Sequence, residues 1–138
     1  TGAAIGAFHA VAVTCRFPDL FHRALGMSGS YELLRFIDHP QPTDYYRVSS
    51  PLHFVPTLAG PHLDLLRTRY IHLASGEGKW ENIGESFRMG SVLGDKGIPN
   101  WVESWGNADH DWVTWRAKLP KYLDDWTAPK KVERAVQV

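Results

Sequence analysis

The sequence predicts an α/β fold in which parallel strands alternate with helices. Three short apolar runs, each followed by turn residues, are predicted strands: 24–27, 70–74 and 101–105. Segments with helical spacing separate these runs, and this alternation is typical of a parallel sheet. The 138 residues suffice for one core, so we assign residues 1–126 to a single domain and 127–138 to a polar tail.

A first helix is predicted from Ile5 to Arg16, because apolar residues recur there at helical spacing and the Phe17-Pro18 step ends the pattern. Residues 38–50 are rich in proline, serine and aspartate and are predicted to be irregular. Pro120 is expected to kink or split the last helix. The further helices are predicted at 31–37, 52–58, 61–67, 80–95 and 111–126.

Composition limits the partners. Lysine plus arginine and aspartate plus glutamate both number 15, and a net charge of zero argues against nucleic acid and against an anionic membrane surface. No run of 18 apolar residues is present, so we expect no membrane partner. The single cysteine, Cys15, is expected to be a small buried hydrophobe, which fits a cytosolic location best. The histidines lack the close spacing of a metal site, and we expect no cofactor.

The first residues contain the most informative motif. Gly2 and Gly6 flank Ala4 with the G-x-x-x-G spacing of a sharp strand-to-helix turn that presents a nucleophilic serine. We expect that a side chain at either glycine would clash. The methyl group of Ala4 cannot attack a carbonyl, whereas the N–H of Ile5 would supply half of an oxyanion hole. The alternative is a glycine-rich segment before an ordinary core helix.

The loops after the second and third predicted strands carry the candidate acid and base. Glu77 and Glu81 follow one strand and His110 the other, which reproduces the order nucleophile, acid, histidine. The imidazole would take a proton from a hydroxyl at position 4, while the acid would orient the ring. Alternatively, the two glutamates only place charge at a helix N-terminus. Ser28 is a poor substitute nucleophile, because its G-x-S-x-G pattern lacks the final glycine.

From residue 1 to about 126, the chain resembles the C-terminal half of the esterase family of α/β-hydrolases. This resemblance implies a serine esterase or acyl hydrolase that acts on a small carboxylic ester. It places Ala4 at the serine position, His110 at the base, and Glu81, before Glu77, as the acid. The likeness rests on TGAAIGAFHA (1–10), FPDLF (17–21), MSGSY (27–31), SGEGKWE (75–81), KGIP (96–99) and WGNADHDW (105–112).

Two departures from the family pattern affect the functional interpretation. Ala4 replaces the nucleophile, either as an engineered knock-out or in a natural pseudoenzyme, so we expect an inactive chain. A non-catalytic binding or interaction protein is the alternative. The family's N-terminal half is absent from these residues, and we expect it on a further stretch of chain, or else a homo-oligomer that covers the open sheet edge. A third, different hypothesis makes Thr1 an N-terminal nucleophile.

Overall fold

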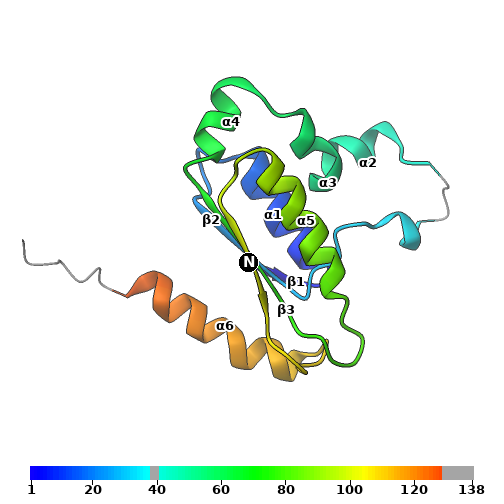
Figure 1. The fold of residues 1–138 in the computed structure, drawn as a ribbon, viewed down its shortest axis with the longest axis vertical. Helices are drawn as coiled ribbons and strands as arrows, with labels where there is room; N and C mark the ends of the chain where they lie inside the picture. The colour runs from blue at the N-terminus through cyan, green and yellow to red at the C-terminus, as the bar shows by residue number, and fades with distance from the viewer. Residues whose placement is uncertain (38–40, 129–138) are drawn as a thin grey trace, which may run out of the picture.

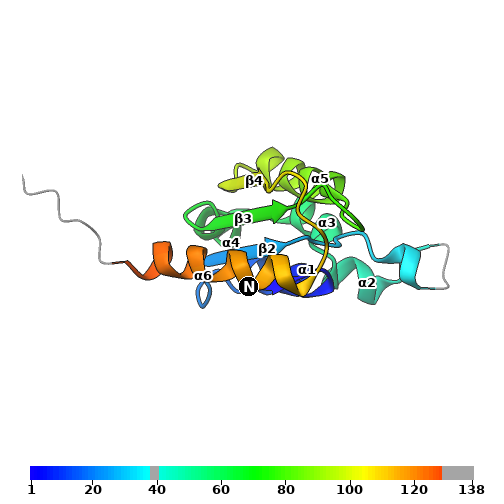
Figure 2. The ribbon, with the colours of Figure 1, turned by 90° about the horizontal axis from the view of Figure 1, so that it is seen from below.

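A computed structural model describes residues 1–37 and 41–128 and contains one parallel sheet in the order β1-β2-β3-β4. Helices α1 and α5 cover one face of this sheet, and α6 covers the other (Figures 1 and 2). The predicted α/β class with parallel strands is therefore confirmed. The strands are β1 (Gly2–Ala3), β2 (Arg23–Met27), β3 (Tyr70–Ser75) and β4 (Asn100–Ser104).

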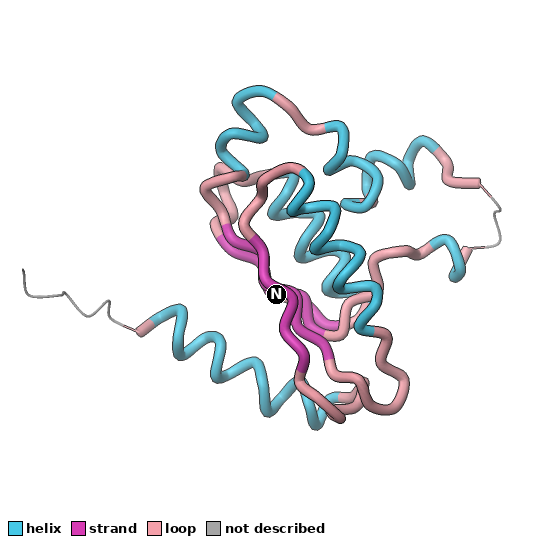
Figure 3. Tube along the Cα trace, in the orientation of Figure 1, coloured by secondary structure: helices cyan, strands magenta, loops and turns pink. Residues whose placement is uncertain are grey.

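The long helices follow the strands, and the short ones lie in the connection between β2 and β3 (Figure 3). Within residues 1–37 and 41–128, no helix is both long and apolar enough to cross a membrane. The helices are α1 (Ile5–Arg16), η1 (Leu34–Phe36), α2 (Asp44–Ser49), α3 (Pro51–Phe54), η2 (Val55–Thr57), α4 (Gly60–Leu66), α5 (Ile83–Asp95) and α6 (Trp112–Thr127).

Most predicted elements are found within a few residues of their predicted bounds. The helix predicted at 31–37 is only the 3₁₀ turn η1, and α2 occupies part of the stretch predicted to be irregular. The side chain of Thr43 caps α2 by accepting the N–H of Tyr46, a signal that the proline-rich composition obscured. Helix α5 begins later than predicted because Trp80 has a φ of 66°, which is not helical. Residues 38–40 and the tail from residue 129 lie outside the described residues.

The sheet has a separate apolar core on each face. Leu73 of β3 packs with Val11 of α1 and Leu93 of α5, whereas its neighbour Ala74 faces Trp115 of α6. Cys15 is fully buried in the first core, as predicted, and desolvation raises the pKa of its thiol to about 12. At neutral pH this thiol is protonated and serves as an apolar side chain.

Helix α6 is fastened to the sheet by hydrogen bonds as well as by packing. The indole N–H of Trp105 donates to the Tyr122 hydroxyl at 2.8 Å, and this hydroxyl in turn donates to the Glu103 carboxylate. Burial, and then the hydrogen bond to Glu103, raise the pKa of Tyr122. Residues on both sides of Pro120, Trp115 and Tyr122, pack in the same apolar cluster, and the helix is continuous. A split at Pro120 is therefore wrong, whereas a kink there stays a prediction.

The two glycines of the first motif have different environments. A Cβ at Gly2 would overlap the carbonyl oxygen of Gly6, so the chain can turn back from β1 into α1 only with glycine there. A Cβ at Gly6 would meet nothing within 4 Å. The expectation of a clash is therefore confirmed for Gly2 and wrong for Gly6, because the first turn of α1 leaves position 6 facing open space.

This difference predicts opposite effects of two alanine substitutions. Gly2→Ala should destabilise the chain by about 1–3 kcal/mol, since the new methyl group meets backbone that cannot move aside easily. Gly6→Ala should be neutral or stabilise by up to about 1 kcal/mol, because alanine is the better helix former. Urea unfolding of both variants and the parent measures the free energies. Equal losses from the two substitutions would contradict this account.

Candidate functional site

The carboxyl ends of all four strands lie at one edge of the sheet. Ala3 is in register with Met27, Met27 with Ala74, and Ser75 with Ser104. Residues that continue these strands therefore emerge next to each other, and ligands of parallel α/β sheets bind at such an edge. Ala4 and Ser28 are the first residues past β1 and β2, and the loops that carry Glu81 and His110 follow β3 and β4.

Ala4 occupies a strained turn between β1 and α1. Its φ of 54° and ψ of −119° are unfavourable for a residue with a Cβ. Hydrogen bonds hold this conformation, because the Ala4 N–H donates to the Met27 carbonyl at 2.9 Å and the Ala4 carbonyl accepts the N–H of Ser30 at 3.2 Å. Such outliers concentrate at functional sites. The tight turn predicted at this position is present.

The side chains of Glu81 and His110 are in direct hydrogen-bonding contact. The imidazole Nδ1 lies 2.6 Å from Oε1 of the carboxylate. The Glu81 side chain is fully buried, whereas that of His110 is 26% exposed. Because a carboxylate only accepts hydrogen bonds, Nδ1 carries the proton of this contact, and Nε2 is the acceptor in the uncharged form of the ring. This tautomer is the one that a general base needs.

The second carboxylate oxygen of Glu81 is held by three donors. Oε2 accepts the Gly76 N–H at 2.6 Å and the hydroxyls of Ser28 and Ser75 at 2.8 and 3.0 Å. Glu81 lies before the first turn of α5, which begins at Ile83, and its carboxylate is engaged in this network rather than with the N–H groups of the helix end.

Glu77 has a different environment. Its carboxylate accepts the hydroxyl of Ser104 at 2.7 Å in an exposed position. The structure therefore brings Glu81, the first choice for the acid, to His110, and leaves Glu77 on the outer side of the loop. Both glutamates precede α5, so the sequence alone did not distinguish them by position.

Backbone contacts fasten the acid loop to the histidine loop. The N–H of Gly78 donates to the Ala108 carbonyl at 2.9 Å, and the N–H of His110 donates to the Lys79 carbonyl at 3.0 Å. The loops approach so closely that a Cβ at Gly76 would overlap the Ala108 carbonyl. The short Glu81–His110 distance is thus fixed by the main chain of both loops.

Two residues at this edge were not predicted to contribute. Ser28 has a φ of 50° and a buried hydroxyl that accepts the indole N–H of Trp115 at 2.9 Å. The Trp115 and His110 rings pack in a T-shaped arrangement, with ring centres 4.9 Å apart. The position of Ser28 directly after a strand was a usable signal, whereas nothing in the sequence indicated which tryptophan would reach it.

Two further observations concern the remaining candidates. Ile5 is the first residue of α1, where N–H groups have no partner within the helix, so its N–H is free to donate to an oxyanion. Among the described residues, no group of three or more His, Cys, Asp or Glu side chains is arranged to hold a metal ion.

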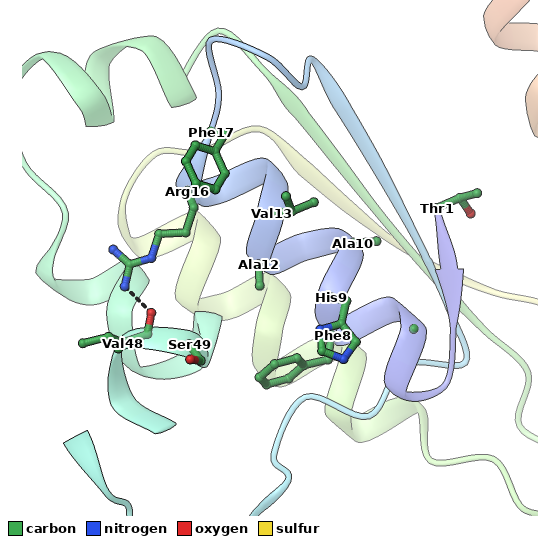
Figure 4. A pocket seen from close by; sticks show the side chains of 11 residues that line it. Thr1, Phe8, His9, Ala10, Ala12, Val13, Arg16, Phe17, Val48 and Ser49 are labelled. Atoms are coloured by element: carbon green, nitrogen blue, oxygen red, sulfur yellow. Dashed lines mark hydrogen bonds between the residues drawn. The ribbon is translucent and has the colours of Figure 1, made fainter. Parts of the chain in front are cut away.

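A large hollow lies elsewhere, along the outer side of α1 (Figure 4). This α1 groove has a volume of about 800 Å³ and is lined mainly by apolar side chains of α1, together with Thr1, His9 and Val48. The Arg16 guanidinium crosses it, contacting the Val48 carbonyl and lying 3.9 Å from the centre of the Phe54 ring. Neither Glu81 nor His110 lines this groove.

Solved structures share this arrangement of strands and helices. A ferulic acid esterase matches 88% of the chain with a TM-score of 0.67 and 19% identity. The S-formylglutathione hydrolase of Staphylococcus aureus matches 91% with a TM-score of 0.63 and 17% identity. The chain has a partial α/β-hydrolase fold. It spans 48% of the length of each of these two proteins. No family model and no curated protein matches the sequence.

At this site of the α/β-hydrolase fold, Glu81→Gln should invert the His110 tautomer. The glutamine amide oxygen would keep the three donors that now bind Oε2, so its NH₂ group would face Nδ1 and donate to it. The proton would then move to Nε2, which ¹⁵N chemical shifts of the imidazole report directly. Glu77→Gln is the matched control and should leave the tautomer unchanged. Retention of the Nδ1–H form in Glu81→Gln would contradict the assigned contact.

Proposed function

We propose that this chain is part of a serine ester hydrolase in which Ala4 occupies the place of the nucleophile, His110 that of the base and Glu81 that of the acid. The main support is the 2.6 Å contact between His110 and Glu81, at the same sheet edge as the strained turn of Ala4. Ala4 and Trp115 belong to one apolar cluster, and Trp115 packs against His110, which brings all three positions to one region.

With serine at position 4, these residues would perform acyl transfer. Nε2 of His110 would take the hydroxyl proton as the oxygen attacks the ester carbonyl, and Glu81 would stabilise the resulting imidazolium. The N–H of Ile5 would donate to the oxyanion. The imidazolium would then protonate the leaving alcohol, and water would release the acid by the same steps. The methyl group of Ala4 has neither a lone pair nor a transferable proton, so the chain with alanine is inactive as an ester hydrolase.

Restoring the hydroxyl tests this proposal. Ala4→Ser in the native polypeptide should raise the hydrolysis of p-nitrophenyl acetate on the order of a hundredfold or more over the parent, because nucleophile and base act as a unit. The double variant Ala4→Ser with His110→Ala should return to the parental rate. If Ala4→Ser hydrolyses the ester no faster than the parent, the proposal fails.

A non-catalytic binding protein is the second candidate, and it is favoured by Ala4 itself. In this case an ester or its carboxylic acid product would bind at the sheet edge without turnover. Binding to the unaltered chain that survives His110→Ala, measured by calorimetry, would support this candidate. Loss of all binding in that variant would count against it.

We also propose that further strands of the same sheet pair with β1. Among the strands of residues 1–37 and 41–128, in the order β1-β2-β3-β4, β1 has a neighbour on one side only, and it lies next to the α1 groove. The N–H of Ala4 points to β2, where it donates to Met27, so the N–H of Ala3 points outward to the open side. The additional strands would be those of the other half of an α/β-hydrolase, on the same or another chain, or of a second copy of this chain.

Hydrogen exchange distinguishes paired from open edges. The Ala3 amide should exchange freely in the isolated 138-residue chain and be protected in the native polypeptide or oligomer, where a neighbouring strand accepts its hydrogen. The Ala4 amide, which is bonded to Met27, is the internal control and should be protected in both. Free exchange of Ala3 in the native assembly would reject the proposed strand pairing.

A further inference from the structure

The hydroxyl proton of Ser28 is committed to Glu81, because its other side-chain partner, Trp115, can only donate. The indole N–H of Trp115 can only donate, and it donates to Ser28 Oγ at 2.9 Å. The single hydroxyl proton of Ser28 is then left for Glu81 Oε2 at 2.8 Å. Ser75 differs, since its hydroxyl divides between the Gly76 carbonyl at 2.9 Å and Glu81 at 3.0 Å.

Trp115 also contacts the imidazole of His110 directly. Its ring meets His110 edge to face, with an interplanar angle of 83°, while its N–H holds Ser28. Only 8% of Trp115 is exposed, and Ser28 is 4% exposed, so water does not compete readily for these bonds. Trp115 therefore contacts both the Ser28 hydroxyl, which binds Glu81, and the ring of His110.

The backbone at Ser28 adds a separate observation. Its φ of 50° is costly for a residue with a Cβ, and its N–H donates to the Ala74 carbonyl at 2.7 Å. This conformation keeps the hydroxyl between Trp115 and Glu81. The two hydrogen bonds of the side chain offset part of the backbone cost.

We infer that Ser28 and Trp115 are positioning residues for the Glu81–His110 pair. Trp115 sets the direction of the Ser28 hydroxyl, the hydroxyl holds Glu81 Oε2, and Oε1 is thereby kept against Nδ1 of His110. Ser28 is not a replacement nucleophile, because its oxygen is buried and engaged on both sides. The catalytic meaning of this inference rests on the proposed function, whereas the positioning itself does not.

NMR of the 138-residue chain tests the positioning without any need for activity. Ser28→Ala and Trp115→Phe should each broaden or shift the Nδ1–H resonance of His110. The first substitution removes a donor to the carboxylate, and the second removes the N–H that sets the direction of the Ser28 hydroxyl. Ser86→Ala is the matched control, since Ser86 is also buried but its hydroxyl has no partner among the described residues. The His62 ring, which contacts the Cys15 carbonyl at 2.7 Å, should be unaffected and reports an intact fold. An unchanged His110 resonance in both variants overturns the inference.

A kinetic measurement in the Ala4→Ser background separates the two proposals. Adding Ser28→Ala or Trp115→Phe should lower kcat about ten- to a hundredfold with little change in KM, because orientation rather than ground-state binding is lost. Adding Ser86→Ala should leave kcat unchanged. If Ala4→Ser is inactive, the proposed function fails while the NMR result still decides the positioning. If kcat is unchanged in both variants, Ser28 and Trp115 do not position the catalytic pair.

Discussion

The buried carboxylate of Glu81 is the interaction on which the arrangement of this sheet edge depends. Its two oxygens contact groups that follow three different strands: Ser28 after β2, Ser75 and Gly76 at the end of β3, and His110 after β4. A buried charge is costly unless every oxygen is satisfied, and here both are. The cost of burying this group therefore selects one arrangement of the loops.

Close backbone approach makes this arrangement possible. Gly76 and Gly78 lie where any side chain would overlap the histidine loop, and Gly2 lies where one would overlap the start of α1. These glycines let the main chains of the acid and histidine loops run side by side, and let Ala4 turn sharply after β1. The strained φ values of Ala4 and Ser28 are tolerated because the hydrogen bonds of neighbouring strand ends fix both residues.

The two faces of the sheet serve different purposes. The face under α1 and α5 holds the larger apolar core, with Val11, Leu73 and Leu93. The face under α6 carries the smaller core that includes Trp115, and it adjoins the proposed site. Tyr122 fastens α6 to β4 through Trp105 and Glu103, so the helix that presents Trp115 is itself held by hydrogen bonds. Packing and site geometry are thus coupled through one helix.

The sequence by itself determined the α/β class, the main strands and the identity of the glutamates and the histidine near the sheet edge. It could do so because apolar periodicity and turn residues are local signals. Only the tertiary structure decided that Glu81 rather than Glu77 reaches His110, that Gly2 but not Gly6 is sterically required, and that α6 continues through Pro120. The hydrogen bond between Ser28 and Trp115 was likewise found only in the tertiary structure, since these residues lie 87 positions apart and meet only when β2 and α6 pack together. Such contacts arise from strand order and helix docking, which no local pattern encodes.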